Sequence, residues 1–363
     1  SGNTALVDGG VGGEGGGALY NSIGMTSTLR NVTLENNQGK EFGGAVWNDG
    51  LLTIEDSRFV GNHADNGGAI YSSEGTQLLA VVRSRFSTNG ASVGGALSSV
   101  RPVTVVDSDF DANGIEEVTN GGALYLALHA GESLLERVTL RNNQASYGAA
   151  LLTEGVTVTI RTSTISQNHA SVSGGAIRAR DARLTFRNVT ITGNTGGANE
   201  AGGIYSNAPT SKLDFVNTVV ANNAPLDCRL LIEFVPVADQ SAPFSIAGDA
   251  SCHFSGLGAL NATDPLLGPL ADNGGLTLTH LPIAGGPAHD GGTNSDCQSP
   301  DQRGAPRPEG AACDVGAVEY DPDFIPTPTP TKAPTATPTR TPTPVNGTPV
   351  AEGTPIYLPA VQR

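Results

Sequence analysis

One acidic run in the sequence has the residue types of a metal site. Asp107, Asp109 and Asp111 occupy alternate positions, so that in an extended strand all three carboxylates would point to one face. Oxygen ligands of this kind suit Ca²⁺, which makes the three acids weak calcium candidates, and calcium is the one cofactor that the sequence suggests. Arg83 and Arg137 flank the run, so ion pairing explains the same acids without a metal.

Two other patterns are typical of catalytic sites but have simpler explanations. Residues 90–94 match the G-x-S-x-G sequence of a nucleophile elbow, which needs a strand before the serine and a helix after it. His63 and His169 both follow an asparagine of the repeats described below. They are four coils apart, about 19 Å at ~4.8 Å per coil, and cannot share a metal ion. We assign no catalytic residue and predict that the chain is not an enzyme.

The composition excludes several classes of protein. The chain has 363 residues, of which 48 are glycine and 15% are charged, with a net charge of -15. An acidic chain with so few lysines is a poor partner for nucleic acid. The sequence has no apolar run of about 18 residues, so no transmembrane helix is expected. An apolar fraction of 38% is too high for a disordered chain.

Two short motifs recur in one register along residues 1–224. A Gly-Gly-Ala triplet, or a degenerate copy of it, ends at residues 18, 45, 69, 96, 123, 150, 176 and 204. A large apolar residue followed three positions later by asparagine keeps pace with the triplet. The asparagines are Asn37, Asn62, Asn89, Asn113, Asn143, Asn168, Asn194 and Asn223.

The pattern within each repeat indicates short β-strands. Segments such as 29–34 and 103–110 are rich in β-branched residues and largely alternate with a period of two. No segment carries a helical apolar stripe of useful length. A parallel β-helix with about 27 residues per coil fits this pattern. Each glycine pair would form a corner, and the asparagines would stack into a ladder of side-chain hydrogen bonds.

Stacked coils also predict which charges become neighbours. Arg83 would lie between Asp56 and Asp107 on the outer wall, in the coils before and after its own. Opposite charges then mostly alternate from coil to coil, as favourable cross-strand pairs require.

The GGA(I/L) and FxxN motifs resemble the passenger repeats of polymorphic outer-membrane proteins. They are seen in residues 68–70 and in Phe59–Asn62, Phe86–Asn89 and Phe110–Asn113. The resemblance covers roughly residues 1–224. It implies a right-handed parallel β-helix displayed on a cell surface, often as an adhesin.

The repeat fades between residues 225 and 320. Within this region, residues 264–275, 301–304 and 313–319 resemble the choice-of-anchor Q domain of bacterial secreted proteins. That resemblance implies export and surface anchoring, and it implies no reaction.

All four cysteines lie in the same region. An even number in a loop-rich segment predicts two disulfides and an oxidising compartment. Three pairings are open, and sequence neighbourhood favours Cys228–Cys252 and Cys297–Cys313. The sequence has no C-x-x-C spacing, which argues against structural zinc.

The last forty residues change character. Residues 322–355 are rich in Pro and Thr and predict an extended linker. Residues 356–363 turn apolar again, and we expect them to act as a docking strand or a sorting signal. A strand that adds to the edge of a neighbouring subunit would join copies head to tail. The assembly candidates are Ile356, Tyr357, Leu358 and Val361.

We therefore predict an all-β protein with a right-handed parallel β-helix at 1–224 and a loop-rich, disulfide-stapled cap at 225–321. A Pro/Thr linker at 322–355 and the terminal segment at 356–363 would follow. We expect a secreted, cell-surface structural or adhesive protein that self-associates along the rod axis.

Two alternatives are a polysaccharide lyase or glycoside hydrolase, and a module that binds cell-envelope glycans or a host surface. The sequence has no lysine–acid cluster that would support a lyase. For glycan binding, aromatic residues are few, and packing against the wall explains them as well. They are Trp47, Tyr71, Tyr125, Tyr147 and Tyr205.

Overall fold

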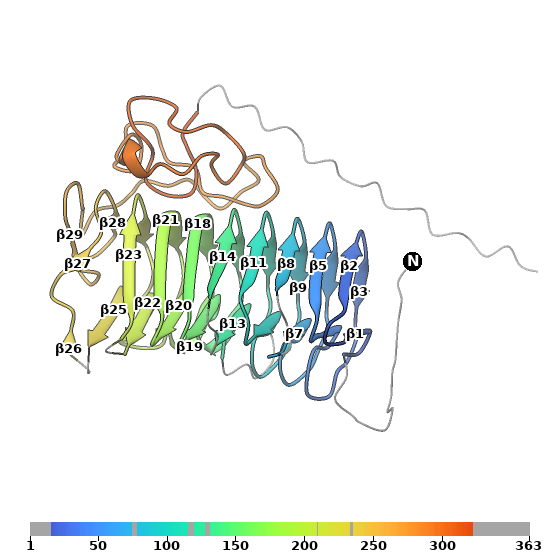
Figure 1. Ribbon diagram of the computed structural model, residues 1–363. Coiled ribbons are helices and arrows are strands. Elements are labelled where there is room, and N and C mark those ends of the chain that lie inside the picture. The colour runs from blue at the N-terminus through green and yellow to red at the C-terminus, as the bar shows by residue number, and fades with distance from the viewer. Residues whose placement is uncertain are drawn as a thin grey trace, which may run out of the picture. The chain divides into compact units, whose positions relative to one another are not determined.

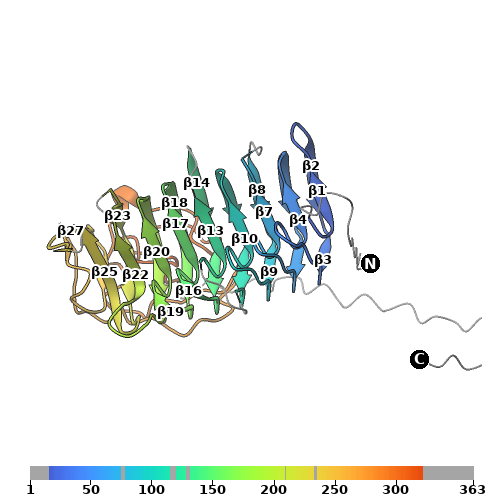
Figure 2. The ribbon, with the colours of Figure 1, turned by 90° about the horizontal axis from the view of Figure 1, so that it is seen from below.

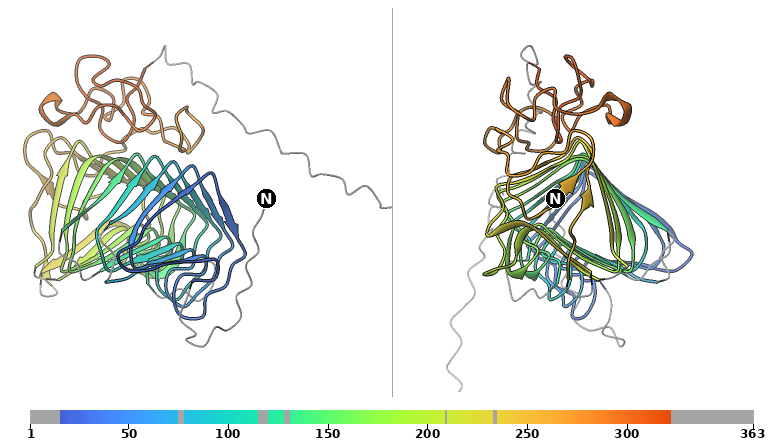
Figure 3. Two further views of the ribbon diagram at one scale, coloured as in Figure 1. Left: turned by 45° about the vertical axis from the view of Figure 1, so that its right-hand side comes forward. Right: turned by 90° about the vertical axis from the view of Figure 1, so that its left-hand side faces the viewer.

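The computed structural model describes residues 16–74, 78–114, 120–127, 131–208, 210–232 and 235–321. Within these ranges the chain winds into a parallel β-solenoid of about eight turns, which confirms the predicted all-β architecture. Successive strands follow one another along the rod from blue to yellow (Figures 1 and 2). Seen from the end, the coils outline a triangle (Figure 3). The assembly candidates at 356–361 lie outside the described residues.

The first wall of the solenoid is a ten-stranded sheet, parallel throughout except for its last pair. Its apolar residues face inward, directly after each Gly-Gly-Ala corner. The strands are β1 (Leu19–Asn21), β4 (Val46–Asn48), β7 (Ile70–Ser72), β10 (Leu97–Ser99), β13 (Leu124–Ala127), β17 (Leu151–Glu154), β20 (Ile177–Arg180), β22 (Ala201–Asn207), β25 (Leu226–Ile232) and β26 (Val235–Pro236).

The second and third walls belong to one 15-stranded sheet that bends at a corner. The second wall contains β2 (Thr26–Arg30), β5 (Leu51–Glu55), β8 (Leu79–Val82), β11 (Val103–Val106), β14 (Glu132–Glu136) and β23 (Lys212–Val216). The third contains β3 (Thr33–Glu35), β6 (Arg58–Val60), β9 (Arg85–Ser87), β12 (Asp109–Asp111), β15 (Thr139–Arg141), β24 (Val219–Ala221) and β28 (Ile246–Ala247). Two long strands run through both walls, β18 (Thr157–Ser166) and β21 (Arg183–Thr192).

The corner between these two walls is a column of residues in the left-handed conformation. Its φ values are between 42° and 54°, at Asn31, Asp56, Arg83, Asp107, Arg137, Thr162, Asn188 and Asn217. The next residue is often a serine whose hydroxyl accepts a backbone N–H from the preceding coil. Ser84 Oγ accepts from Ser57 N at 3.1 Å, and Ser108 Oγ from Ser84 N at 3.0 Å. This hydroxyl ladder, which the sequence motifs did not reveal, satisfies backbone donors that the bend removes from the sheet.

The Gly-Gly corners need glycine for two separate reasons. The first glycine of the pair, such as Gly94, has a φ of +61°. At the second, Gly95, an added Cβ would lie 2.1 Å from the carbonyl oxygen of Gly122 in the next coil. Ala149 takes this second position in one coil, beside the short sheet formed by β16 (Gln144–Tyr147) and β19 (His169–Ser173).

In the interior, apolar side chains of successive coils stack on one another. Phe59, Phe86 and Phe110 lie fully buried with ring centroids 4.7 and 4.5 Å apart and planes within 5° of parallel. Phe186 and Phe215 repeat this arrangement at 4.6 Å. Burial of each such ring contributes about 2–3 kcal/mol. The core therefore forms one continuous cluster along the rod.

The predicted asparagine positions do form a ladder. Asn89 donates from its side-chain amide to Asn113 Oδ1 at 2.9 Å and to the Phe59 carbonyl at 3.0 Å, and each coil repeats this scheme. At one end the ladder finishes on a carboxylate, where Asn223 donates to Asp227 Oδ1 at 2.9 Å. At the other end the buried Asn37 Oδ1 has no hydrogen-bond partner within the described part of the chain.

Stacking continues past residue 224, where the sequence repeat fades. β25 extends the first wall and β28 the third, while β27 (Gln240–Ser241) pairs with β29 (Phe254–Ser255). A disulfide joins Cys228 to Cys252 within this last part of the rod. Phe254 packs against Phe215 and continues the aromatic core.

The remaining loop-rich segment, residues 264–321, lies along the side of the third wall (Figure 1). We call it the C-terminal cover; it includes the 3-10 helix η1 (Asn294–Asp296). A cap over the end of the rod is expected from the sequence, whereas the cover packs on outward side chains of several successive coils. Thr139 Oγ1 donates to the Leu278 carbonyl at 2.7 Å, and Ser166 Oγ lies 3.0 Å from His280 Nε2.

The reason for this placement is a change in the outward residues of the third wall. Early coils present charged side chains there, such as Arg58 and Arg85. Later coils present small residues, all of them buried under the cover: Thr139, Thr164, Ser166, Thr190, Thr192, Val219 and Ala221. Small hydroxyl and apolar groups leave room for a second layer, whereas a charged wall stays in water.

Candidate functional site

Equivalent residues of successive coils lie above one another, so outward side chains form columns along each wall. At the corner column, Arg83 Nε lies 2.7 Å from Asp56 Oδ1, as the repeat register predicted. This hydrogen bond lowers the pKa of Asp56. Asp107, expected as the second neighbour of Arg83, forms its ion pair with Arg137 Nε of the following coil at 2.6 Å.

The other two calcium candidates also face arginines. Asp111 Oδ2 lies 2.9 Å from Arg85 and 2.6 Å from Arg141, and Asp109 Oδ1 lies 3.2 Å from Arg141. Burial raises the pKa of Asp109 even though two guanidinium groups oppose the shift. Guanidinium groups therefore occupy the oxygens that a cation would use. Within the described ranges, no group of three or more His, Cys, Asp or Glu side chains is placed to hold a metal ion.

A groove of about 220 Å³ lies on the same wall, beside the C-terminal cover. Arg58 and Arg85 are direct partners in adjacent strands of this groove, an unfavourable juxtaposition of like charges. Arg58 forms no ion pair with the residues that the structure describes, whereas Arg85 is held by Asp111. The lining residues are Asp56, Ser57, Arg58, Arg83, Ser84, Arg85, Asp107, Asp109 and Leu276. With three arginines and three aspartates the groove is balanced in charge.

The remaining candidate chemistry lies in repeat corners. His63 and His169 belong to different coils, and His169 Nδ1 lies 2.7 Å from Thr195 Oγ1 in the coil that follows. The G-x-S-x-G stretch at 90–94 leads into a Gly-Gly corner and then into β10, so the helix that a nucleophile elbow requires does not follow it.

A column of outward residues runs along the first wall, and five of its nine members are aromatic. Each member lies in register with the equivalent residue of the next coil, in the order Tyr20, Trp47, Tyr71, Ser98, Tyr125, Leu152, Arg178, Tyr205 and Arg229. The sequence showed these aromatic residues as few and scattered, and only the shared step after each Gly-Gly-Ala corner hinted at a common face. The structure brings them together on one side of the rod.

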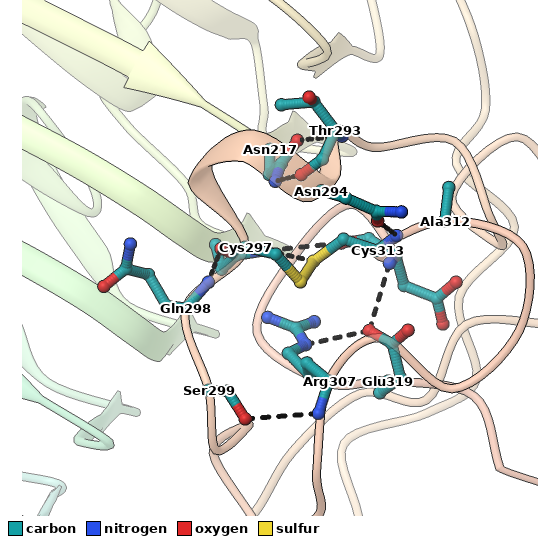
Figure 4. Close-up of a disulfide and its surroundings, with 12 residues drawn as sticks. Asn217, Thr293, Asn294, Cys297, Gln298, Ser299, Arg307, Ala312, Cys313 and Glu319 are labelled. Carbon is teal, nitrogen blue, oxygen red and sulfur yellow. Dashed lines mark hydrogen bonds and ion pairs between the residues drawn. A yellow bond between two sulfur atoms is a disulfide. The ribbon is translucent and has the colours of Figure 1, made fainter.

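Residues of the 301–304 and 313–319 motifs form the interior of the C-terminal cover. Arg307 Nε lies 2.8 Å from Glu319 Oε2 and Arg303 Nε 3.0 Å from Asp301 Oδ2, and all four side chains are buried. A second disulfide, between Cys297 and Cys313, closes the same region (Figure 4). The motifs therefore stabilise the cover and form no open site.

The cover also contains a carboxyl group with a strongly shifted affinity for protons. Burial, with a smaller effect from the charge of Glu319, raises the pKa of Asp314 to about 6. Its oxygens accept the backbone N–H groups of Asp290 and Tyr320. The shift reflects this enclosed, structural position.

Comparison with known proteins finds a similarity for two of the repeats. The family model of the Chlamydia polymorphic membrane protein repeat matches residues 56–73 and 162–180. Each match begins at a left-handed corner residue, includes a ladder asparagine and a glycine corner, and ends in the first wall. No curated protein matches the chain. No solved structure matches it either.

The fold defines the class of protein, a parallel β-solenoid, and two stretches of it are similar to the repeat of the polymorphic membrane proteins. These repeats and the two disulfides indicate a surface or extracellular protein. Among the described residues, no helix has the length and apolar character needed to cross a bilayer.

Proposed function

We propose that the chain is a structural or adhesive protein of the cell surface that associates end to end along the solenoid axis. The observation that carries this proposal is the distribution of exposed apolar side chains. At the first described coil, Ile23 and Met25 are 69% and 58% exposed. At the opposite end of the rod, Leu257 and Val235 are 76% and 63% exposed. Contact between two unlike ends of this kind would produce a chain of copies.

The first described end of the asparagine ladder supports the same proposal. Asn37 is 1% exposed, and among the residues that the structure describes its Oδ1 has no hydrogen-bond partner. In every later coil this oxygen accepts N–H groups from the coil before, as Asn62 Oδ1 does from Asn37. A strand added to this end would supply the missing donor by β-augmentation.

Sedimentation velocity of the full chain over a range of concentrations tests the association. We expect oligomers that become longer as the concentration rises. The double variant Ile23→Asp, Met25→Asp should abolish them. Val172→Asp is the matched control, since Val172 is exposed on β19 at the side of the rod. A full chain that stays monomeric at all concentrations would refute the proposal.

A chain truncated after Asp323 separates two modes of association. If truncation abolishes the oligomers, the terminal segment with Ile356, Tyr357, Leu358 and Val361 makes the contact. If truncation leaves them unchanged, the ends of the solenoid make it.

We infer a structural role in preference to catalysis because the acids of the third wall are paired with arginines. The resemblance of the C-terminal motifs to the choice-of-anchor Q domain supports attachment to the envelope. Assays with neutral and acidic polysaccharides test the enzyme alternative, and release of reducing ends or unsaturated sugars would establish it.

A further inference from the structure

Four partly exposed rings form a continuous patch at the start of the first wall. We call Tyr20, Phe42, Trp47 and Tyr71 the aromatic patch. The ring centroids of Tyr20 and Trp47 are 5.1 Å apart, those of Trp47 and Phe42 5.4 Å, and those of Phe42 and Tyr71 4.4 Å. Phe42, from the turn before a glycine corner, thus fills the space between two members of the column. The series follows the rod axis through three successive coils.

One carboxylate fixes the orientation of these rings. Asp49 Oδ2 accepts the Tyr20 hydroxyl at 2.7 Å, and Asp49 Oδ1 accepts Trp47 Nε1–H at 2.9 Å. Ser73 Oγ donates to the same Oδ1. A carboxylate has about four lone-pair positions, so one acceptor position remains. The rings are therefore held in place before any ligand arrives, which reduces the entropy lost on binding.

The charge at the patch is negative. Asp49 lies within it and Glu74 beside it, and burial together with these two charges raises the pKa of Tyr71. A ligand with carboxylate or sulfate groups would be repelled here. Flat rings with polar edges suit a partner that has both apolar faces and hydroxyl groups.

We propose that the aromatic patch binds a neutral polysaccharide, whose pyranose rings stack on the aromatic rings while Asp49 accepts a sugar hydroxyl. The rings recur from coil to coil along the axis, which suits an extended, repeating ligand better than a single small molecule. This binding activity goes beyond the structural role proposed above and does not depend on self-association.

The far end of the same column offers a matched control. There Arg178 lies over the rings of Tyr147 and Tyr205, at 4.1 and 5.3 Å from their centroids. The guanidinium group covers the ring faces that a sugar would need. Tyr205 therefore has the same register position as Trp47, but the Arg178 guanidinium covers a face of its ring.

The chain has one tryptophan, so intrinsic tryptophan fluorescence reports on the patch alone. We would titrate the full chain with cellohexaose, chitohexaose and xylohexaose as neutral probes and with oligogalacturonate as an acidic one. We expect a saturable change in Trp47 fluorescence with at least one neutral probe and none with oligogalacturonate. Absence of a saturable change with all three neutral probes at millimolar concentration overturns the proposal.

Substitutions inside and outside the aromatic patch test where the polysaccharide binds. Tyr71→Ala should weaken binding about tenfold or more, as loss of a central aromatic contact does, and Tyr205→Ala should leave it unchanged. Equal affinities of the two variants for the neutral probe would overturn the placement of the binding site on the aromatic patch. Thermal unfolding verifies that each variant folds. If Tyr71→Ala does not fold, Tyr20→Ala replaces it, because the ring of Tyr20 is more exposed. Asp49→Asn tests the charge argument, because it should allow oligogalacturonate to bind.

Discussion

Thr164 donates from its hydroxyl to Gln302 Oε1 at 2.6 Å, and both side chains are buried although 138 residues separate them. Gln302 Nε2 in turn donates to Thr139 Oγ1 at 2.8 Å and to Thr277 Oγ1 at 2.9 Å. One glutamine thus joins two coils of the solenoid to two segments of the C-terminal cover. The contact shows that the cover is a second layer on the third wall.

Replacement of this glutamine should loosen the cover. Gln302→Ala removes a hydrogen-bond partner from three buried threonine hydroxyls, of which Thr139 keeps its bond to the Leu278 carbonyl. We expect a loss of about 2–4 kcal/mol in the free energy of unfolding. Chemical denaturation measures the loss, and hydrogen exchange shows whether it is confined to residues 264–321. Gln298→Ala is the control, since its side chain is only partly buried and bonds to Asp296 within the same loop. A loss of similar size in both variants would contradict this role for Gln302.

The asparagine ladder should be most sensitive in the middle of the rod. Asn113 Oδ1 accepts two N–H groups of Asn89, and its amide donates to the Phe86 carbonyl and to Asn143 Oδ1. Asn113→Ala therefore leaves several buried groups unpaired, at a cost of about 2–4 kcal/mol. Asn37→Ala should cost less, because its Oδ1 already has no hydrogen-bond partner in residues 16–321 as far as these are described. The thermal unfolding midpoints of the two variants compare these losses of stability. Equal decreases in the midpoint would refute this difference between the middle and the end of the ladder.

The second glycine of a corner should not tolerate a methyl group. At Gly95 the new Cβ would lie 2.1 Å from the carbonyl oxygen of Gly122, so two coils would have to separate. We expect Gly95→Ala to destabilise the protein by about 3 kcal/mol or more. Gly268→Ala is the control, because its nearest contact would be an ordinary 3.5 Å. Circular dichroism melts compare them, and a stable Gly95→Ala protein would disprove the close approach.

Stability should depend on the proton of Asp314. Its pKa rises from 3.8 to about 6 on folding, so the folded protein binds this proton more tightly than the unfolded chain. The resulting stabilisation is complete below about pH 4 and is lost as the pH rises through 6, a total of about 2–3 kcal/mol. In Asp314→Asn this part of the pH dependence should disappear. Denaturation between pH 4 and 7 measures it, with the exposed Asp239→Asn as control; an unchanged pH profile in Asp314→Asn would argue against the shift.

Much of the fold follows from the sequence alone because a solenoid repeats local rules. The glycine pairs predict corners such as Gly94–Gly95. There the left-handed φ of the first glycine, and the close approach of the next coil to the second, exclude other residues. The asparagines predict a ladder because they bond from one coil to the next, about 27 residues apart in the sequence. The pairing of Cys228 with Cys252 follows a similarly short separation of 24 residues. Such contacts recur at nearly the same separation in the sequence, so the spacing of the motifs predicts them.

Contacts that do not recur were decided only by the tertiary structure. Gln302 reaches Thr164 across 138 residues, and no period encodes that distance. Trp47 and Tyr71 look isolated in the sequence, and Phe42 joins their rings only once the turn before the glycine corner is folded. The sequence by itself determined the repeating coil, because the interactions of the coil join residues about one repeat apart. The tertiary structure decided what lies on the coil's surface, because that depends on side chains brought together from unrelated positions.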